Sequence, residues 1–170
     1  MMTPPAASTT VAGTAALADL TREERLLLWG MRVWVAGAHR CAPVLGIIET
    51  AFATVMADAV IPLLDVTLFQ IMTARPLAFH SPECPAIGDD ERTLLDVLAL
   101  HQHGEGTAAL FLTRRLLPAA AARLVGGDLR GLANGLLACG IALPDRRARE
   151  LAAAVARPAS AWAPSSRAVH

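Results

Sequence analysis

Residues 41–75 form a long stretch dominated by apolar side chains, and this stretch limits the folds that the chain can adopt. Only three acidic residues interrupt it, Glu49, Asp58 and Asp65, and a proline, Pro62, lies inside it. A proline in a helix interior removes one backbone hydrogen bond and clashes with the preceding turn, at a cost of about 3 kcal/mol. The stretch is therefore either one kinked helix or a helical hairpin that reverses at Pro62.

Two observations favour the kinked helix. No glycine, asparagine, aspartate or serine lies beside Pro62 in residues 59–64, so the usual turn residues are missing there. The polar residues also keep one helical phase across the proline, within about 80° on a helical wheel; they are Thr50, Thr54, Asp58 and Asp65. The sequence predicts a single kinked helix over residues 43–74.

The rest of the chain also has the signals of helices. Thr21 and Glu24 form a capping box that begins the first helix, which ends near residues 37–40. A loop rich in proline follows the central stretch from residue 76 to residue 88. After the loop we expect helices over 89–103, 107–117, 118–125, 128–139 and 145–157, where glycine or proline marks most ends.

The predicted fold class is all-α, an irregular helical bundle around one long kinked central helix with several short C-terminal helices. The chain has 170 residues, which suits one domain with a single core. The expected organisation is a disordered tail over residues 1–18, one helical domain over 19–157 and a second disordered tail over 158–170, because both ends are rich in small and polar residues.

Composition argues against several classes of partner. The formal net charge is zero, so there is no electrostatic argument for binding nucleic acid or an anionic membrane surface. The longest charge-free run in the central stretch, Val66–Ala74, has nine residues, whereas a membrane-spanning helix needs about 20. All 15 basic residues are arginine and alanine is the commonest residue, which is typical of a GC-rich bacterial genome. Three cysteines and no secretory signal favour a cytoplasmic protein.

Two His/Cys pairs flank the central stretch and could together bind a metal. His39 and Cys41 precede it, and His80 and Cys84 follow it. Two imidazoles and two thiolates are a ligand set that zinc accepts. A straight helix over residues 43–74 would span roughly 48 Å, and the following loop recovers only about 20 Å, so a rod keeps the pairs apart within one chain. A hairpin or an antiparallel dimer would bring them together.

Other candidate chemistries are weaker. Cys84 precedes a helix N-terminus, as a reactive thiol can, but no oxyanion-hole motif accompanies it. His101 and His103 diverge on a helix, and the expected arrangement is a partly buried His101 with His103 near the negative end of its helix. Three arginines, Arg146, Arg147 and Arg149, resemble the start of a DNA-reading helix, but an ordinary helical pair explains them better.

A central rod of about 48 Å would overhang a compact domain whose radius of gyration is about 15–16 Å, and its apolar surface would need cover. We therefore expect a homodimer or another protein partner, with a buried seam made of Leu45, Ile48, Phe52, Val55, Ala59, Leu63, Val66 and Phe69. The expected function is that of a small bacterial interaction or regulatory protein, an adaptor or subunit, without catalysis and without a cofactor. The alternative is a metal-binding or redox-responsive protein that holds zinc or iron with His39, Cys41, His80 and Cys84.

Overall fold

A computed structural model of the chain describes residues 16–146, and the predicted all-α class is confirmed in that part. The α-helices are α1 (Arg22–Arg40), α2 (Leu45–Ala53), α3 (Ile61–Ala74), α4 (Asp89–Gln102), α5 (Gly106–Leu116) and α6 (Ala119–Ala138). Two short 3-10 helices, η1 (Leu17–Asp19) and η2 (Asp58–Val60), precede α1 and α3.

The predicted capping box begins α1. The Thr21 hydroxyl accepts a hydrogen bond from the Glu24 amide at 3.2 Å, and the Glu24 carboxylate accepts one from the Thr21 amide at 2.8 Å. At the other end, Gly37 leaves room for the Val44 side chain, which would overlap any β-carbon at position 37. The chain can therefore fold back onto α1 before α2 begins at Leu45, two residues after the predicted start at Pro43.

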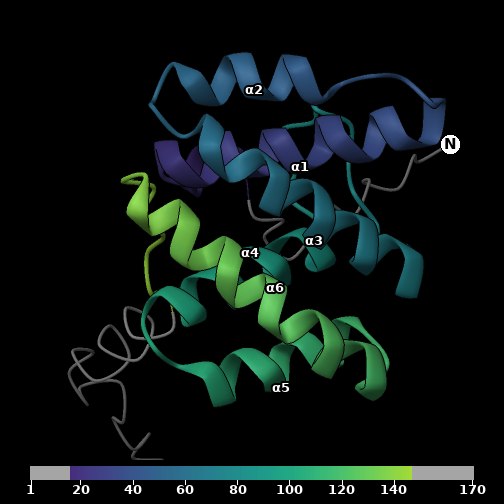
Figure 1. The fold of residues 1–170 in the computed structure, drawn as a ribbon, viewed down its shortest axis with the longest axis vertical. Helices are drawn as coiled ribbons and strands as arrows, with labels where there is room; N and C mark the ends of the chain where they lie inside the picture. Colours follow the sequence, from purple (N-terminus) through teal and green to yellow (C-terminus); the bar gives the residue numbers. More distant parts are fainter. Residues whose placement is uncertain (1–15, 147–170) are drawn as a thin grey trace, which may run out of the picture.

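The predicted single kinked helix over residues 43–74 is wrong. The stretch forms two helices, α2 and α3, and the chain reverses between them at residues 54–57 (Figure 1). Met56 adopts the left-handed conformation, with φ of 60°, and the Met56 and Ala57 amides donate to the Ala53 and Phe52 carbonyls at 3.0 Å. This pattern is a Schellman motif, which usually has glycine at the left-handed position. Pro62 lies in the first turn of α3, where proline is tolerated.

The two halves of the domain meet along α3 and α6. Figure 1 shows α2 and α3 lying against α1, with α6 packed beside both α3 and α4, and α5 below them. The sequence predicted that a helix ends at Gly126 and Gly127, and this prediction is wrong. Helix α6 continues through both glycines and buries Val125 and Leu129 on either side of them. One core thus runs through the whole domain.

The folded part begins before the predicted boundary at residue 19. Ala16 forms an isolated bridge with Ala86, and the Leu17 amide donates to the Pro85 carbonyl at 2.9 Å. Leu20 is buried in the core. Residues 1–15 of the predicted N-terminal tail (1–18), the predicted C-terminal tail over 158–170 and most of the predicted helix over 145–157 lie outside the described residues.

Within residues 16–146, none of the helices combines the length and the apolar composition that crossing a membrane requires.

Candidate functional site

The two predicted His/Cys pairs lie closer together than a rod would allow, because α2 and α3 fold back on each other. His39, near the end of α1, and His80, in the loop after α3, line one hollow of about 200 Å³ together with Arg40 and Phe79. Cys41 caps α1 and is exposed, and neither it nor Cys84 lines this hollow. Among residues 16–146, no group of three or more His, Cys, Asp and Glu side chains is arranged to hold a metal ion.

The loop that carries His80 and Cys84 is held in place by one buried arginine, Arg32 of α1. Its guanidinium contacts the Glu91 carboxylate through Nε at 2.7 Å and Nη2 at 2.8 Å. The other donors bond to backbone carbonyls of the loop, Cys84 at 2.7 Å, Ala86 at 2.6 Å and Ser81 at 3.4 Å. All five guanidinium donors are therefore used, which leaves Arg32 none for a ligand.

Glu91 completes this buried cluster from the first turn of α4. Besides Arg32, its carboxylate accepts hydrogen bonds from the backbone amides of His80 at 2.9 Å and Gly88 at 2.8 Å. Burial by itself would raise the pKa of Glu91, but the hydrogen bonds from Arg32 and the two amides, with the charge of the guanidinium, hold that pKa below its ordinary value. The pair is structural: it fixes the loop against α1 and α4.

The sequence contains one local signal for the buried position of Arg32. Arg32 is the only charged residue between Leu26 and Ala38, and it shares a helical face with the buried residues Leu28 and Val35. A lone charge on a buried face requires a partner. Its identity was not readable, because Glu91 follows 59 residues later in the chain.

His101 in the last turn of α4 and His103, which caps that helix, both contact other parts of the fold. His101 is half-buried, and burial, followed by the charge of Arg130, lowers its pKa below the ordinary value. The Nε2 atom of His103 lies 3.0 Å from the Leu143 carbonyl oxygen, so this ring contacts the segment after α6. The expected partly buried position of His101 is confirmed.

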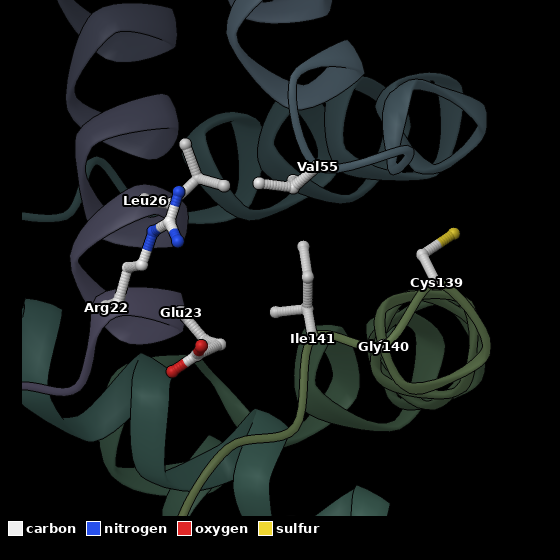
Figure 2. Close-up of a pocket in the computed structure, with 7 residues that line it drawn as sticks. All are labelled: Arg22, Glu23, Leu26, Val55, Cys139, Gly140 and Ile141. Atoms are coloured by element: carbon white, nitrogen blue, oxygen red, sulfur yellow. The ribbon is translucent and has the colours of Figure 1, made fainter.

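A small hollow joins the start of α1 to the end of α6. It has a volume of about 90 Å³ and is lined by Arg22, Glu23, Leu26, Val55, Cys139, Gly140 and Ile141. In Figure 2 the side chains of Leu26, Val55 and Ile141 point toward one another, whereas the Cys139 sulfur points away from them. This volume is well below the roughly 300–1,000 Å³ of ordinary ligand pockets, so the hollow is small for a substrate site.

The outer face of α3 is a candidate interaction surface. Two large apolar side chains are exposed there, Val66 at 48% and Phe69 at 63%, and Leu63 at the edge toward α6 is exposed at 41%. Asp65 is the only charged residue in α3, and its carboxylate accepts a hydrogen bond from the Trp34 indole at 2.6 Å. Because the outer face of a surface helix is normally polar or charged, α3 is an exception.

The predicted buried seam is therefore divided between the core and the surface. Ile48 and Phe52 of α2 are buried in the chain's own core and Val55 is partly buried. The remaining five residues are exposed: Leu45, Ala59, Leu63, Val66 and Phe69. The turn at residues 54–57 changes the helical phase between α2 and α3, so the eight residues do not share one face.

Two hollows border this face between α3 and the neighbouring helices. One, of about 260 Å³, is lined by Trp34, Ala38, His39, Phe69, Met72, Thr73 and Pro76. The other, of about 230 Å³, lies toward α2 and is lined by Trp34, Ala38, Ala42, Pro43, Val44, Leu45 and Asp65. Trp34 and Ala38 of α1 contribute to both, so the two hollows adjoin along the same edge of α3.

Comparisons of the chain with protein-family models, with curated proteins and with solved structures gave no match.

Proposed function

We propose that this protein is a helical interaction protein, an adaptor or regulatory subunit without catalysis, which binds a protein chain through the outer face of α3. The observation that carries the proposal is the pair of exposed residues Val66 and Phe69 on a helix whose single charge, Asp65, is engaged by Trp34. Covering a large apolar side chain releases about 1.5–3 kcal/mol relative to leaving it in water.

Phe69 differs from Phe111, which is also exposed, in the residues that surround it. Phe111 of α5 has the same exposed fraction, 63%, but exposed Arg114 and Arg115 follow it at the i+3 and i+4 positions, on the same side of the helix. Single exposed apolar residues among charges are ordinary on protein surfaces. Phe69 instead lies one turn from exposed Val66 and lines an apolar hollow, which is typical of an interaction surface.

The proposal can be tested with a photo-crosslinking amino acid at position 69 in the full chain, expressed in cells. We expect one discrete covalent adduct to a protein, and we expect it to disappear when Val66→Glu is added. The same amino acid at position 111 is the matched control and should give no such adduct. Absence of an adduct at position 69, or an indistinguishable pattern at positions 69 and 111, would contradict the proposal.

A further inference from the structure

We propose that the partner of the α3 face is a basic amphipathic segment of another protein. Its apolar residues cover Val66 and Phe69, and its arginine or lysine side chains meet Glu49 and Asp58. This inference rests on the proposed function and adds the chemistry of the partner. It follows from the charges that border the exposed apolar residues of α3.

A third hollow, which is acidic, adjoins the apolar face at the start of α3. It has a volume of about 500 Å³ and lies between α2 and η2. Its two charged lining residues are Glu49 and Asp58. The uncharged lining residues are Thr50, Ala53, Ala59 and Pro62. Pro62 connects the hollow to the apolar face, because Pro62, Val66 and Phe69 are all exposed and lie at the i, i+4 and i+7 positions on one side of α3.

Glu49 and Asp58 are available to a cationic partner. Both side chains are exposed, and neither forms an ion pair with another residue of the described part, 16–146. Residues 41–74, which include α2, η2 and α3, contain three acids and no lysine, arginine or histidine. The whole chain has zero formal net charge, so this excess of negative charge is local. It attracts a basic segment and repels nucleic acid and anionic membranes.

The same charges argue against a second copy of the chain as the partner. In a two-fold contact each surface patch meets the same patch. The patch made by α2, η2 and α3 contains no basic residue, so a second copy would offer Glu49 and Asp58 no counter-charge from these elements. A partner of opposite charge is favoured, because complementary potentials select the partner and steer its approach.

The distance between the acidic hollow and Phe69 sets the spacing of groups in the partner. Pro62, beside the hollow, and Phe69 are seven residues apart on α3, which corresponds to about 10.5 Å along the helix axis. A partner helix that lies along α3 therefore needs its basic residues about two turns from the apolar residue that covers Phe69. An apolar centre with a charged rim is the usual composition of a protein interface.

Two model peptides test the charge preference on the full chain. Each is a helical peptide of about 18 residues with leucine along one face, and the other positions are lysine in one peptide and glutamate in its partner. Fluorescence anisotropy measures the Kd values. We expect the lysine peptide to bind about tenfold more tightly than the glutamate peptide at low salt, with a smaller difference at roughly 0.5 M salt, which screens exposed charges. Equal Kd values at low salt, or no measurable binding of the lysine peptide, would overturn the inference.

Removing the two acids of the hollow tests where the lysine peptide binds. Glu49→Gln combined with Asp58→Asn should weaken its binding by about fivefold, because each exposed ion pair contributes modestly. The matched control is Glu83→Gln combined with Glu105→Gln, which makes the same change in net charge at exposed acids in the loop before α4 and at the start of α5. The control should change the Kd by less than about twofold, since distant charges are screened. Equal effects of the two double variants would overturn the inference, because binding would then depend on net charge alone.

The photo-crosslink at position 69 separates this inference from the proposed function, once mass spectrometry has identified the linked segment. A linked segment of another protein with arginine or lysine within about two turns of the cross-linked residue supports both. A segment that is acidic or uncharged, or α3 of a second copy, overturns the inference and leaves the proposed function standing. Absence of an adduct overturns both.

Discussion

Arg32 and Glu91 are the two side chains on which the position of the loop after α3 depends most. Arg32 is 1% exposed and Glu91 is fully buried, and together they bond to the backbone of five loop residues, at positions 80, 81, 84, 86 and 88. A buried ion pair of this kind does little for stability compared with apolar residues of the same shape, but losing one partner leaves the other charge uncompensated.

Replacing Arg32 with methionine tests this role. Arg32→Met removes every donor to the loop and leaves the Glu91 carboxylate buried without its counter-charge, so we expect the free energy of unfolding to fall by about 3–5 kcal/mol. Urea denaturation followed by circular dichroism measures the change. Arg40→Met on the same helix is the control, because Arg40 is exposed, and it should change the unfolding free energy by less than about 0.5 kcal/mol. Similar values for both variants would show that the cluster is not structural.

The lowered pKa of Glu91 predicts a particular pH dependence. A carboxylate whose folded-state pKa lies below the unfolded-state value stabilises the fold above the unfolded-state pKa, and this stability is lost as the pH falls through the folded-state pKa. Glu91→Gln should therefore be much less stable than the wild type at pH 7, and the difference should shrink steadily below the ordinary glutamate pKa. Unfolding free energies measured from pH 7 to pH 3 check this. A difference that stays constant with pH would contradict it.

At the scale of the elements, the sequence predicted helix ends well where glycine or proline forms them and poorly at the end of α2. The ends at Gly104 and Gly140 have φ of 80° and 81° and were predicted from the glycines. The end of α2 has the same hydrogen-bond pattern, but its left-handed residue is Met56, which carries no turn signal. The chain turns there because Ile48 and Phe52 pack against Gly30 of α1, a contact between distant residues that local sequence does not show.

The left-handed conformation of Met56 gives a test of the turn. A side chain in this conformation costs roughly 1–2 kcal/mol, which glycine avoids, although glycine loses more entropy on folding. Because Met56 is 84% exposed, little packing is lost, and Met56→Gly should raise the unfolding free energy by about 0.5–1 kcal/mol. Met56→Val should lower it, since β-branched residues are disfavoured there. The reverse order would indicate a continuous helix through residue 56.

The continuity of α6 can be tested at Gly126 and Gly127. Both lie in the interior of the helix, and an added β-carbon would meet open space at either position. Gly126→Ala and Gly127→Ala should therefore each stabilise the protein by about 0.5–1 kcal/mol. Gly104→Ala is the control and should destabilise it, because its φ of 80° disfavours a side chain. Destabilisation by both α6 substitutions would instead support the two short helices that the sequence predicted.

At the scale of the whole molecule, the turn at residues 54–57 removes the overhanging rod from which a partner was predicted. The exposed apolar residues of α3 are a separate reason to expect a partner. No long rod overhangs the domain, because α2 and α3 fold back and both lie against α1. The central stretch nevertheless contains more apolar residues than one core can cover. The stripe of Ile48 and Phe52 is buried, while Val66 and Phe69 remain outside. The sequence thus identified the apolar segment but not which of its faces would be exposed.

The candidate site was only partly predictable for the same reason. The loop that carries His80 and Cys84 was placed correctly between the central stretch and α4, from its prolines. His39 and His80 line one hollow, and Cys41 and Cys84 lie apart from it. The position of the loop that carries His80 depends on the pairing of Arg32 with Glu91, which lie 59 residues apart in the chain. Tertiary contacts of this kind leave no periodic pattern in the sequence.

The most direct test of the α3 face is the photo-crosslinking amino acid at position 69 of the full chain, compared with the same amino acid at position 111. We expect a discrete protein adduct from position 69 alone, because Phe69 and Val66 are exposed on a helix whose one charge is bonded to Trp34. No adduct from position 69, or the same adducts from both positions, would contradict an interaction surface on α3.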